Sequence, residues 1–587
     1  MLEILRQHKA LLLSLILIFC GGLLAWLVQT GAGQVELRDT RFTSASGATL
    51  SALLYVPEGV NADNPAPGVL AVHGYINSRE TQSAYAIELA RRGYVVLAMD
   101  QRGHGYSDPP AFAEGFGGPA GLSYLRSLDI VDKQQVILAG HSMGGWTVLS
   151  AAVAMPDAYT SVVVSGSSTG TFGVPAGDAS FPRNFGLVFG QYDEFSPSMW
   201  SSATGAGIVD TEKLQTQFGV SESVQPERLY GSIADGTARQ LYQPAQTHPA
   251  NHITRSGVAG ALDWIQRTST APNPIPADQQ IWPWKEFGTF LSLLGGIMFL
   301  VSAGPALLKL PLFRELAAAP APSAGIRDRG WYLAALIVMA IPALSYFSFQ
   351  AWAATIPTTA LFAQNLTNGF MVWALGNALI SLVLFSLWHF ALGGRAGGGN
   401  GHNYGLRSGG EFSARQLALG LLLALTVVFS LYLLLAIVHG LFTADFRYWV
   451  IAVKLMNGLQ FRLFLGYLLP FTAFFLVFAL ILHGQMRSKD TQSFARAATI
   501  NALLAGGGIL ALLLYQYGAL FITGSLAIPA QALLTIVALQ FVVLLPIAAI
   551  ISTRYFMATG QLYVGAFING LFVTWLIVAG QATHYAF

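Results

Sequence analysis

A serine between two glycines, in Gly140-His-Ser142-Met-Gly144, is the first candidate for chemistry in this chain. The run before it, Val136 to Ala139, is typical of a buried strand, and the residues after it, Trp146 to Ala152, favour a helix. Because glycine has no Cβ, such a strand, turn and helix can hold a serine hydroxyl on a sharp elbow. We therefore expect Ser142 to be a nucleophile.

A second G-x-S-x-G pattern, Gly166-Ser-Ser168-Thr-Gly170, shows that the pattern alone is weak evidence. A chain with 62 glycines produces such a match by chance on the order of once. Here the residues that follow, Thr171-Phe-Gly-Val-Pro175, cannot start a helix. We therefore interpret Ser168 as a loop residue.

The composition indicates a membrane protein. Of the 587 residues, 53% are hydrophobic and only 10% are charged, which excludes a wholly soluble chain. The first 286 residues carry 17 Lys and Arg against 24 Asp and Glu, whereas the remainder carries 14 against 5. We infer two regions of different chemistry. The single cysteine, Cys20, allows no intramolecular disulfide.

Residues 1–33 are expected to form a transmembrane signal anchor. Ala10 to Val28 contains no charged residue and is long enough to cross a bilayer as a helix. It is longer than a typical signal-peptide core and no clear cleavage motif follows, so we expect the helix to be retained. Its basic flank, Arg6 and Lys9, should stay in the cytoplasm.

The next region, residues 34–272, is expected to be one α/β domain. Strands are predicted over 35–43 and 50–56, and buried strands over Gly68–Gly74 and Tyr94–Asp100. Helical patterns separate the later strands. This alternation predicts a mostly parallel sheet with helices on both faces.

Three motifs at successive strand ends carry a resemblance to a known family: His73-Gly-Tyr75, Asp100 to Ser107, and Gly140 to Gly145. In order and spacing they resemble the α/β-hydrolase superfamily, especially its esterase, lipase and serine-aminopeptidase-like branches. The resemblance covers roughly residues 34–270 and implies the α/β-hydrolase fold. It says nothing about the rest of the chain.

A serine nucleophile needs a histidine to take its proton and a carboxylate to orient that histidine. The resemblance implies the chain order serine, acid, histidine. It places the acid at Asp193, directly after the strand predicted over Asn184–Gly190. The neighbouring Glu194 is expected to point elsewhere.

Two histidines, His248 and His252, are candidates for the base. The final helix of the domain is expected over Ser256–Arg267, with Ser256 as its N-cap. In the family, the histidine usually precedes this helix by seven or eight residues. His248 fits that spacing better, and His252 remains the alternative.

The resemblance also implies an oxyanion hole, formed by the backbone N–H groups of Tyr75 and Met143. The other histidines near these motifs, His73, His104 and His141, are interpreted as structural. Residues 196–236, in the long interval between acid and base, are expected to wall the pocket. We expect no metal and no cofactor.

A linker over residues 273–286 leads to a polytopic membrane domain over residues 287–587. Its spans are predicted near 287–308, 331–354, 368–392, 416–441, 461–484, 497–523, 530–551 and 560–582. Eleven of the 14 basic residues lie in loops that become cytoplasmic if the α/β domain is extracytoplasmic. Because basic loops stay inside, we predict that topology.

No Asp, Glu, Lys or Arg lies in the middle of a predicted span, which weakens a transport function. Polar residues there, such as Asn377, Gln516 and Asn569, are interpreted as contacts between helices. The sequence thus predicts a membrane-anchored serine hydrolase that forms an acyl-enzyme with an ester, lipid or hydrophobic peptide. Esters are favoured over amides, and no nucleic-acid partner is expected. An acyltransferase with the same triad, or a transporter or receptor whose hydrolase fold only binds, remains the alternative.

Overall fold

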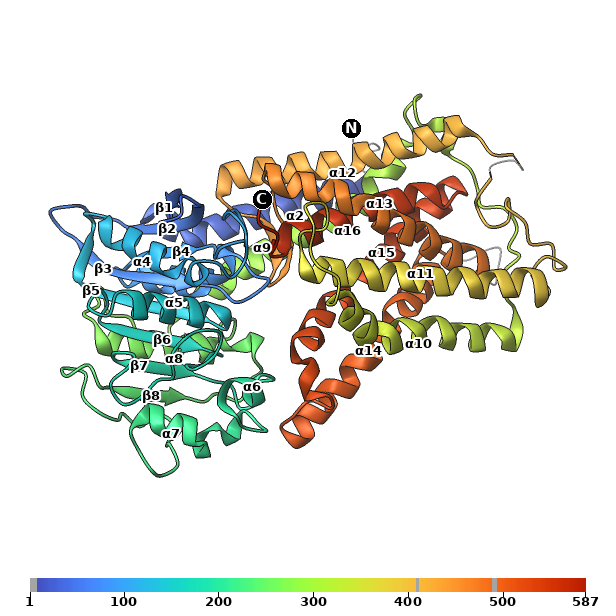
Figure 1. Ribbon diagram of the computed structural model, residues 1–587. Coiled ribbons are helices and arrows are strands. Elements are labelled where there is room, and N and C mark those ends of the chain that lie inside the picture. The colour runs from blue at the N-terminus through green and yellow to red at the C-terminus, as the bar shows by residue number, and fades with distance from the viewer. Residues whose placement is uncertain (1–7, 408–410, 488–492) are drawn as a thin grey trace. The chain divides into compact units, whose positions relative to one another are not determined.

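The computed structural model describes residues 8–407, 411–487 and 493–587 of the chain (Figure 1). Arg6 and parts of the loops at 393–415 and 485–496 therefore lie outside the described residues. The chain divides into two compact units. The helical unit comprises Met1–Gly22, Thr289–Leu514 and Val537–Ala579, and the sheet unit comprises Leu23–Gly288, Tyr515–Ile536 and Gly580–Phe587.

The sheet unit contains an eight-stranded, mostly parallel sheet with the order β1-β2-β4-β3-β5-β6-β7-β8. Its strands are β1 Val35–Thr43, β2 Thr49–Pro57, β3 Ala66–Val72, β4 Val95–Met99, β5 Val131–His141, β6 Ser161–Ser165, β7 Phe185–Val188 and β8 Arg239–Tyr242. Only β2 pairs antiparallel with its two neighbours, β1 and β4. From β4 to β8 every pair is parallel, so the loops after these strands meet at one edge of the sheet.

Helices cover both faces of the sheet, as predicted (Figure 1). The helices are α3 Ser83–Arg91, α4 Gly118–Ser127, α5 Met143–Ala154, α6 Ser196–Trp200, α7 Glu212–Phe218 and α8 Arg255–Thr268. One apolar core lies between the sheet and α4 with α5, and it includes Leu122 and Trp146. The other lies between the sheet and α3 with α8, and it includes Tyr85 and Trp264. This is the doubly covered sheet that buried parallel strands require.

Nine helices among the described residues are long and apolar enough to cross a membrane. They are α2 Lys9–Gln29, α9 Trp282–Leu307, α10 Asp328–Ala353, α11 Asn365–Ala391, α12 Ala414–Phe442, α13 Gly458–Leu480 with a π-helical extension to Gln485, α14 Phe494–Thr523, α15 Ala532–Thr559 and α16 Tyr563–Gly580. Each coincides with a predicted span. Their number and length are typical of a multi-pass membrane protein.

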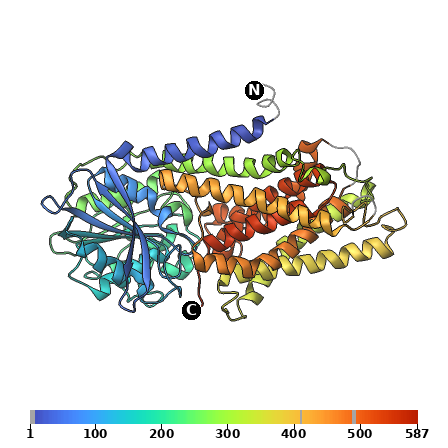
Figure 2. The ribbon, with the colours of Figure 1, turned by 90° about the horizontal axis from the view of Figure 1, so that it is seen from above.

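Within the helical unit, the long helices lie side by side (Figure 2). Buried polar side chains join neighbouring helices there, as expected for residues in apolar surroundings. Asn377 on α11 donates to Ser345 on α10 (3.1 Å), and Asn569 on α16 donates to the backbone oxygen of Ala548 on α15 (2.8 Å). Their interpretation as contacts between helices is confirmed.

Candidate functional site

Ser142 lies on a sharp elbow between β5 and α5. Its backbone has φ 53° and ψ −122°, a conformation that is costly for a residue with a Cβ. The flanking glycines make the elbow possible: a Cβ on Gly140 would lie 2.2 Å from the Gly144 oxygen, and one on Gly144 would lie 2.1 Å from the Val72 oxygen. Ser168 instead lies in a loop after β6, where its hydroxyl is paired with that of Thr171 (2.9 Å).

The structure brings Ser142, His248 and Asp193 together. His248 Nε2 lies 2.9 Å from Ser142 Oγ, while Nδ1 lies 3.1 and 3.0 Å from the two carboxylate oxygens of Asp193. Asp193 follows β7 and His248 follows β8, so all three residues stand at the same edge of the parallel sheet. His248 and Asp193 are buried, whereas Ser142 is partly exposed.

Electrostatics favour a charged form of His248 that is paired with Asp193. Burial by itself lowers the pKa of His248, but the charge and hydrogen bond of Asp193 outweigh it, and the pKa is raised above its ordinary value. Asp193 is in turn held by Asn251, whose side-chain amide donates to Oδ2 at 2.7 Å. Asn251 was not predicted, although it lies only three residues after His248.

His252, the alternative base, contacts neither Ser142 nor Asp193 among the hydrogen bonds of the described residues. Its ring stacks on His141, with the ring centroids 3.7 Å apart. Burial, followed by the charge of His248, lowers the pKa of His252 to about 3, so the ring stays neutral. His141 contacts the backbone oxygen of His248 through Nε2 (3.2 Å).

Glu194 does not point away from the site, contrary to the expectation. One of its carboxylate oxygens accepts the backbone N–H of His248 at 2.6 Å. Both Asp193 and Glu194 are buried, so two adjacent carboxylates contact the same histidine, one at its ring and one at its backbone. Burial and the charge of Asp193 raise the pKa of Glu194 to about 7.

The turn after β3, with Gly74 and Tyr75, lies directly beside Ser142. A Cβ on Gly74 would lie 3.0 Å from the Cβ of Ser142. On the other side of the serine, Met143 is the first residue of α5, and the N–H of a first helical residue has no carbonyl partner within its helix. The two expected oxyanion donors therefore come from segments that flank the serine.

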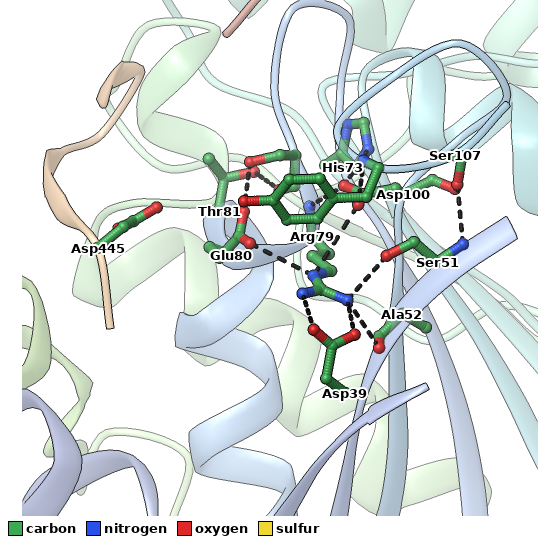
Figure 3. A network of polar contacts seen from close by, with 12 residues as sticks. Asp39, Ser51, Ala52, His73, Arg79, Glu80, Thr81, Asp100, Ser107 and Asp445 are labelled. Carbon is green, nitrogen blue, oxygen red and sulfur yellow. Dashed lines mark hydrogen bonds and ion pairs between the residues drawn. The ribbon is translucent and has the colours of Figure 1, made fainter. Parts of the chain in front are cut away.

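A polar network around the buried Arg79 anchors the segment after this turn (Figure 3). The guanidinium of Arg79 donates to both carboxylate oxygens of Asp39 (2.6 and 2.9 Å) and to the backbone oxygen of Ala52 (3.0 Å). The backbone N–H of Arg79 donates to Asp100 at 2.8 Å. These bonds tie the segment after β3 to β1, β2 and the end of β4.

Two segments from the far end of the chain belong to the sheet unit. The first is a hairpin, Tyr515–Ile536, which consists of the end of α14, the connecting loop and the start of α15. The second is the tail, Gly580–Phe587, in which the backbone of Thr583 exchanges hydrogen bonds with Gly103 and Ala111 (both 2.8 Å). His584 Nε2 lies 3.0 Å from the hydroxyl of Tyr75. No sequence pattern indicated either contact.

Residues before His248 pack against its ring and against the loop after β6, and the helix after His248 differs from the prediction. Phe195 packs edge-on against the ring of His248, with 4.5 Å between the centroids. Trp200 on α6 donates from its indole to the backbone oxygen of Ser167 (3.0 Å). The N-cap of α8 is Thr254, which accepts the Gly257 N–H, whereas Ser256 donates to Gln246 and lies inside the helix.

Comparison with known proteins is consistent with this architecture. Residues 67–273 match the family model described as alpha/beta hydrolase fold. The palmitoyl-protein thioesterase ABHD10, mitochondrial, of Rattus norvegicus is 32% identical over 105 residues, which are 18% of this chain and 35% of that protein. The protein of the same name from Mus musculus is 32% identical over 99 residues, 16% of this chain and 33% of that one. The chain thus spans about a third of the length of these relatives.

Among solved structures, the thioesterase domain from the curacin biosynthetic pathway is 14% identical with a TM-score of 0.26, covering 39% of this chain and 98% of that one. The matched domain of this chain is an α/β hydrolase, distantly related to thioesterases and esterases. In family terms, the chain contains an α/β-hydrolase domain within residues 67–273, which is followed by a long helical region with many long apolar helices.

Proposed function

We propose that the chain is a membrane-anchored serine hydrolase that cleaves esters or thioesters of membrane-associated acyl chains through an acyl-enzyme on Ser142. The observation that carries the proposal is the unbroken series of contacts from Ser142 Oγ through His248 to Asp193. A serine hydroxyl has little nucleophilicity at neutral pH, and this series supplies the base that activates it.

The proposed reaction has two halves. Ser142 Oγ attacks the acyl carbonyl carbon while His248 Nε2 takes the hydroxyl proton, and the imidazolium is stabilised by Asp193. The oxyanion accepts hydrogen bonds from the backbone N–H groups of Met143 and Tyr75. When the bond to the leaving group breaks, His248 returns the proton to the departing oxygen or sulfur. Water, deprotonated by His248, then attacks the carbonyl carbon of the acyl-enzyme. When the bond between this carbon and Ser142 Oγ breaks, His248 returns the proton to Oγ, and the acid is released.

The substrate class is inferred from the attachment of the domain and from its relatives. Nine membrane-length helices favour a substrate that partitions into a bilayer. The name of the curated relative, a palmitoyl-protein thioesterase, favours a long acyl chain bound as a thioester. Amides remain less favoured because an amine is a poorer leaving group than an alcohol or a thiol. We further propose that the hydrolase domain is extracytoplasmic.

Fluorophosphonate labelling of the full chain in detergent tests the assignment. We expect Ser142→Ala to lose the label and to reduce turnover of acyl esters and thioesters by about 10⁴-fold or more. Ser168→Ala is the matched control, since this serine shares the sequence pattern but lies in a loop, and it should label normally. Retention of turnover in Ser142→Ala would refute the proposal. An acyl acceptor added to the assay separates hydrolysis from acyl transfer.

A further inference from the structure

A second buried carboxylate, that of Glu194, stands behind the proposed base. Its Oε2 accepts the backbone N–H of His248 at 2.6 Å, and its Oε1 accepts the hydroxyl of Tyr517 at 3.0 Å. The reaction proposed above uses neither residue. Glu194 thus joins the backbone of His248 to a residue 323 positions from itself in the sequence.

Tyr517 is held firmly by the hairpin, Tyr515–Ile536. Next to it, Gln516 donates to Thr535 (2.8 Å) and accepts the backbone N–H of Ile528 (2.9 Å), which closes the hairpin on itself. Apolar packing fixes the hairpin to the loop that carries the acid. Leu520, Leu526 and Ala532 form a buried cluster against Tyr192 and Phe195, which flank Asp193 and Glu194.

Close backbone contact further fixes the hairpin. Gly524 has φ +81°, and a Cβ there would lie only 2.7 Å from the side chain of Thr204. Phe521 packs edge-on against Tyr192, with the ring centroids 5.4 Å apart. The hydroxyl of Tyr517 therefore reaches Glu194 from a scaffold with several independent contacts, and not from a single long side chain.

The charge of Glu194 affects His248. Burial and the neighbouring Asp193 raise the pKa of Glu194 to about 7, so its charge changes near neutral pH. The ionised form contributes to the raised pKa of His248. The titratable groups around the pair are Asp193 from the loop after β7, His252 from the loop before α8, His141 from β5 and Tyr517 from α14.

The contact can persist in both charge states. Because the N–H of His248 can only donate, Oε2 of Glu194 must remain an acceptor. When the carboxyl is protonated, the proton belongs on Oε1, which then donates to the hydroxyl oxygen of Tyr517. When the carboxyl is ionised, the Tyr517 hydroxyl donates instead.

We propose that Glu194 and Tyr517 are positioning residues for His248, through which the hairpin between two membrane-length helices sets the activity of the hydrolase site. The pair fixes the backbone that carries the imidazole, and the carboxylate stabilises the imidazolium formed during acylation. This inference rests on the proposed function, because it assigns a role to residues that act through the base.

The test measures the rate of fluorophosphonate labelling of Ser142 and the kcat and KM for an acyl thioester, in the full chain, between pH 5 and 9. Tyr517→Phe should lower the labelling rate and kcat by about three- to tenfold, as for the loss of one hydrogen bond, with little change in KM. Tyr515→Phe is the matched control, because Tyr515 lies two residues earlier on the same helix and is 60% exposed. It should behave as the wild type.

The pH profile distinguishes positioning from general destabilisation. Labelling requires neutral His248, so its rate rises with pH through the pKa of that histidine. Glu194→Gln keeps an acceptor for the His248 N–H but removes the negative charge, which should lower the pKa of His248. The midpoint of the rise should therefore move to lower pH by about 0.5 to 1 unit. Glu222→Gln, at an exposed carboxylate, should leave the midpoint in place.

A double variant tests whether Tyr517 acts through Glu194. If it does, adding Tyr517→Phe to Glu194→Gln should change the rate by less than about twofold further. Independent, multiplicative losses would overturn the inference, as would an unchanged rate and pH midpoint in the single variants. If Tyr517→Phe fails to fold, the pH midpoint of Glu194→Gln tests the inference alone, and an unchanged midpoint would overturn it. Absence of labelling in the wild type would instead refute the proposed function.

Discussion

His248 and His252 lie four positions apart, and the difference between them is one of geometry and charge. Of the two rings, only that of His248 faces a carboxylate. Its pKa is raised because Asp193 stabilises the protonated ring. His252 is buried beside other histidines, which disfavours protonation. A base must accept a proton during each turnover, so His252 is poorly suited to that role.

His248→Ala should therefore reduce turnover nearly as much as Ser142→Ala does, by about 10⁴-fold or more, because serine and base act as one unit. His252→Ala should reduce turnover by less than about tenfold, because it removes only the packing of His252 on His141. The measurements are kcat/KM for an acyl ester and the rate of fluorophosphonate labelling. The opposite ranking would transfer the role of base to His252.

The residues of the candidate site were predictable to the extent that they lie at strand ends. Ser142 and Asp193 each follow a strand whose apolar run is visible in the sequence, and the family order suggested their roles. The strand before His248, Arg239-Gln-Leu-Tyr242, has no such run, and His248 was predicted from its distance to the final helix. Glu194 was misjudged, because the direction of its side chain depends on where the backbone of His248 passes. Tyr517 could not be found, since no local pattern relates it to a loop 323 residues earlier.

Most of the strands and all of the membrane-length helices were predicted, because their apolar runs have characteristic lengths. However, β8 was not predicted, and α15 ends at Thr559, beyond the span predicted over 530–551. The start of α8 shows where this fails. Both Thr254 and Ser256 are suitable caps, and the hydroxyls of both donate to the same oxygen of Gln246. Thr254 is the cap because its hydroxyl oxygen also accepts the N–H of Gly257. The tail after α16 carried no signal, because its contacts are mainly backbone pairings that any short segment can form.

The tail nevertheless contacts the loop after β4 and, through Tyr75, the turn after β3, and we predict that it supports this turn, which carries a proposed oxyanion donor. Deletion of residues 582–587 removes the two backbone hydrogen bonds of Thr583 and the partner of the Tyr75 hydroxyl. The rate of acyl-enzyme formation should fall by about five- to fiftyfold, a loss consistent with several hydrogen bonds of typical strength. Deletion of only Ala586 and Phe587, which are exposed, is the control and should leave the rate unchanged.

An equal rate in the two truncated chains would show that the tail does not support the turn. Thermal unfolding of both chains separates a local effect from a loss of stability. The longer deletion should lower kcat far more than it raises KM, because Tyr75 is proposed to contact the oxyanion and not the ground-state substrate.

Across the whole chain, the sheet unit is built from more than one continuous stretch of the sequence. The sheet unit includes the hairpin between α14 and α15 and the tail after α16, so the last third of the sequence contributes to it twice. This division was not visible in the sequence, where composition separates the chain at about residue 287.

The membrane topology decides which substrates the site can reach. The basic flank of the first helix and eleven of the 14 basic residues after position 286 fall on one side if the hydrolase domain is extracytoplasmic. Because positively charged loops are retained in the cytoplasm, the opposite orientation would place these residues on the disfavoured side. We therefore predict an extracytoplasmic hydrolase domain and a cytoplasmic loop at 393–415.

The single native cysteine makes this prediction easy to test. In a Cys20→Ser background, Ala62→Cys places a thiol on an exposed loop of the hydrolase domain, and Ala396→Cys places one on the exposed loop after α11. A membrane-impermeant maleimide added to intact cells should modify the first variant and not the second, whereas both should react after the membrane is opened. The reverse pattern would put the hydrolase domain in the cytoplasm. Its substrates would then be acylated molecules of the inner face, even with Ser142 as the nucleophile.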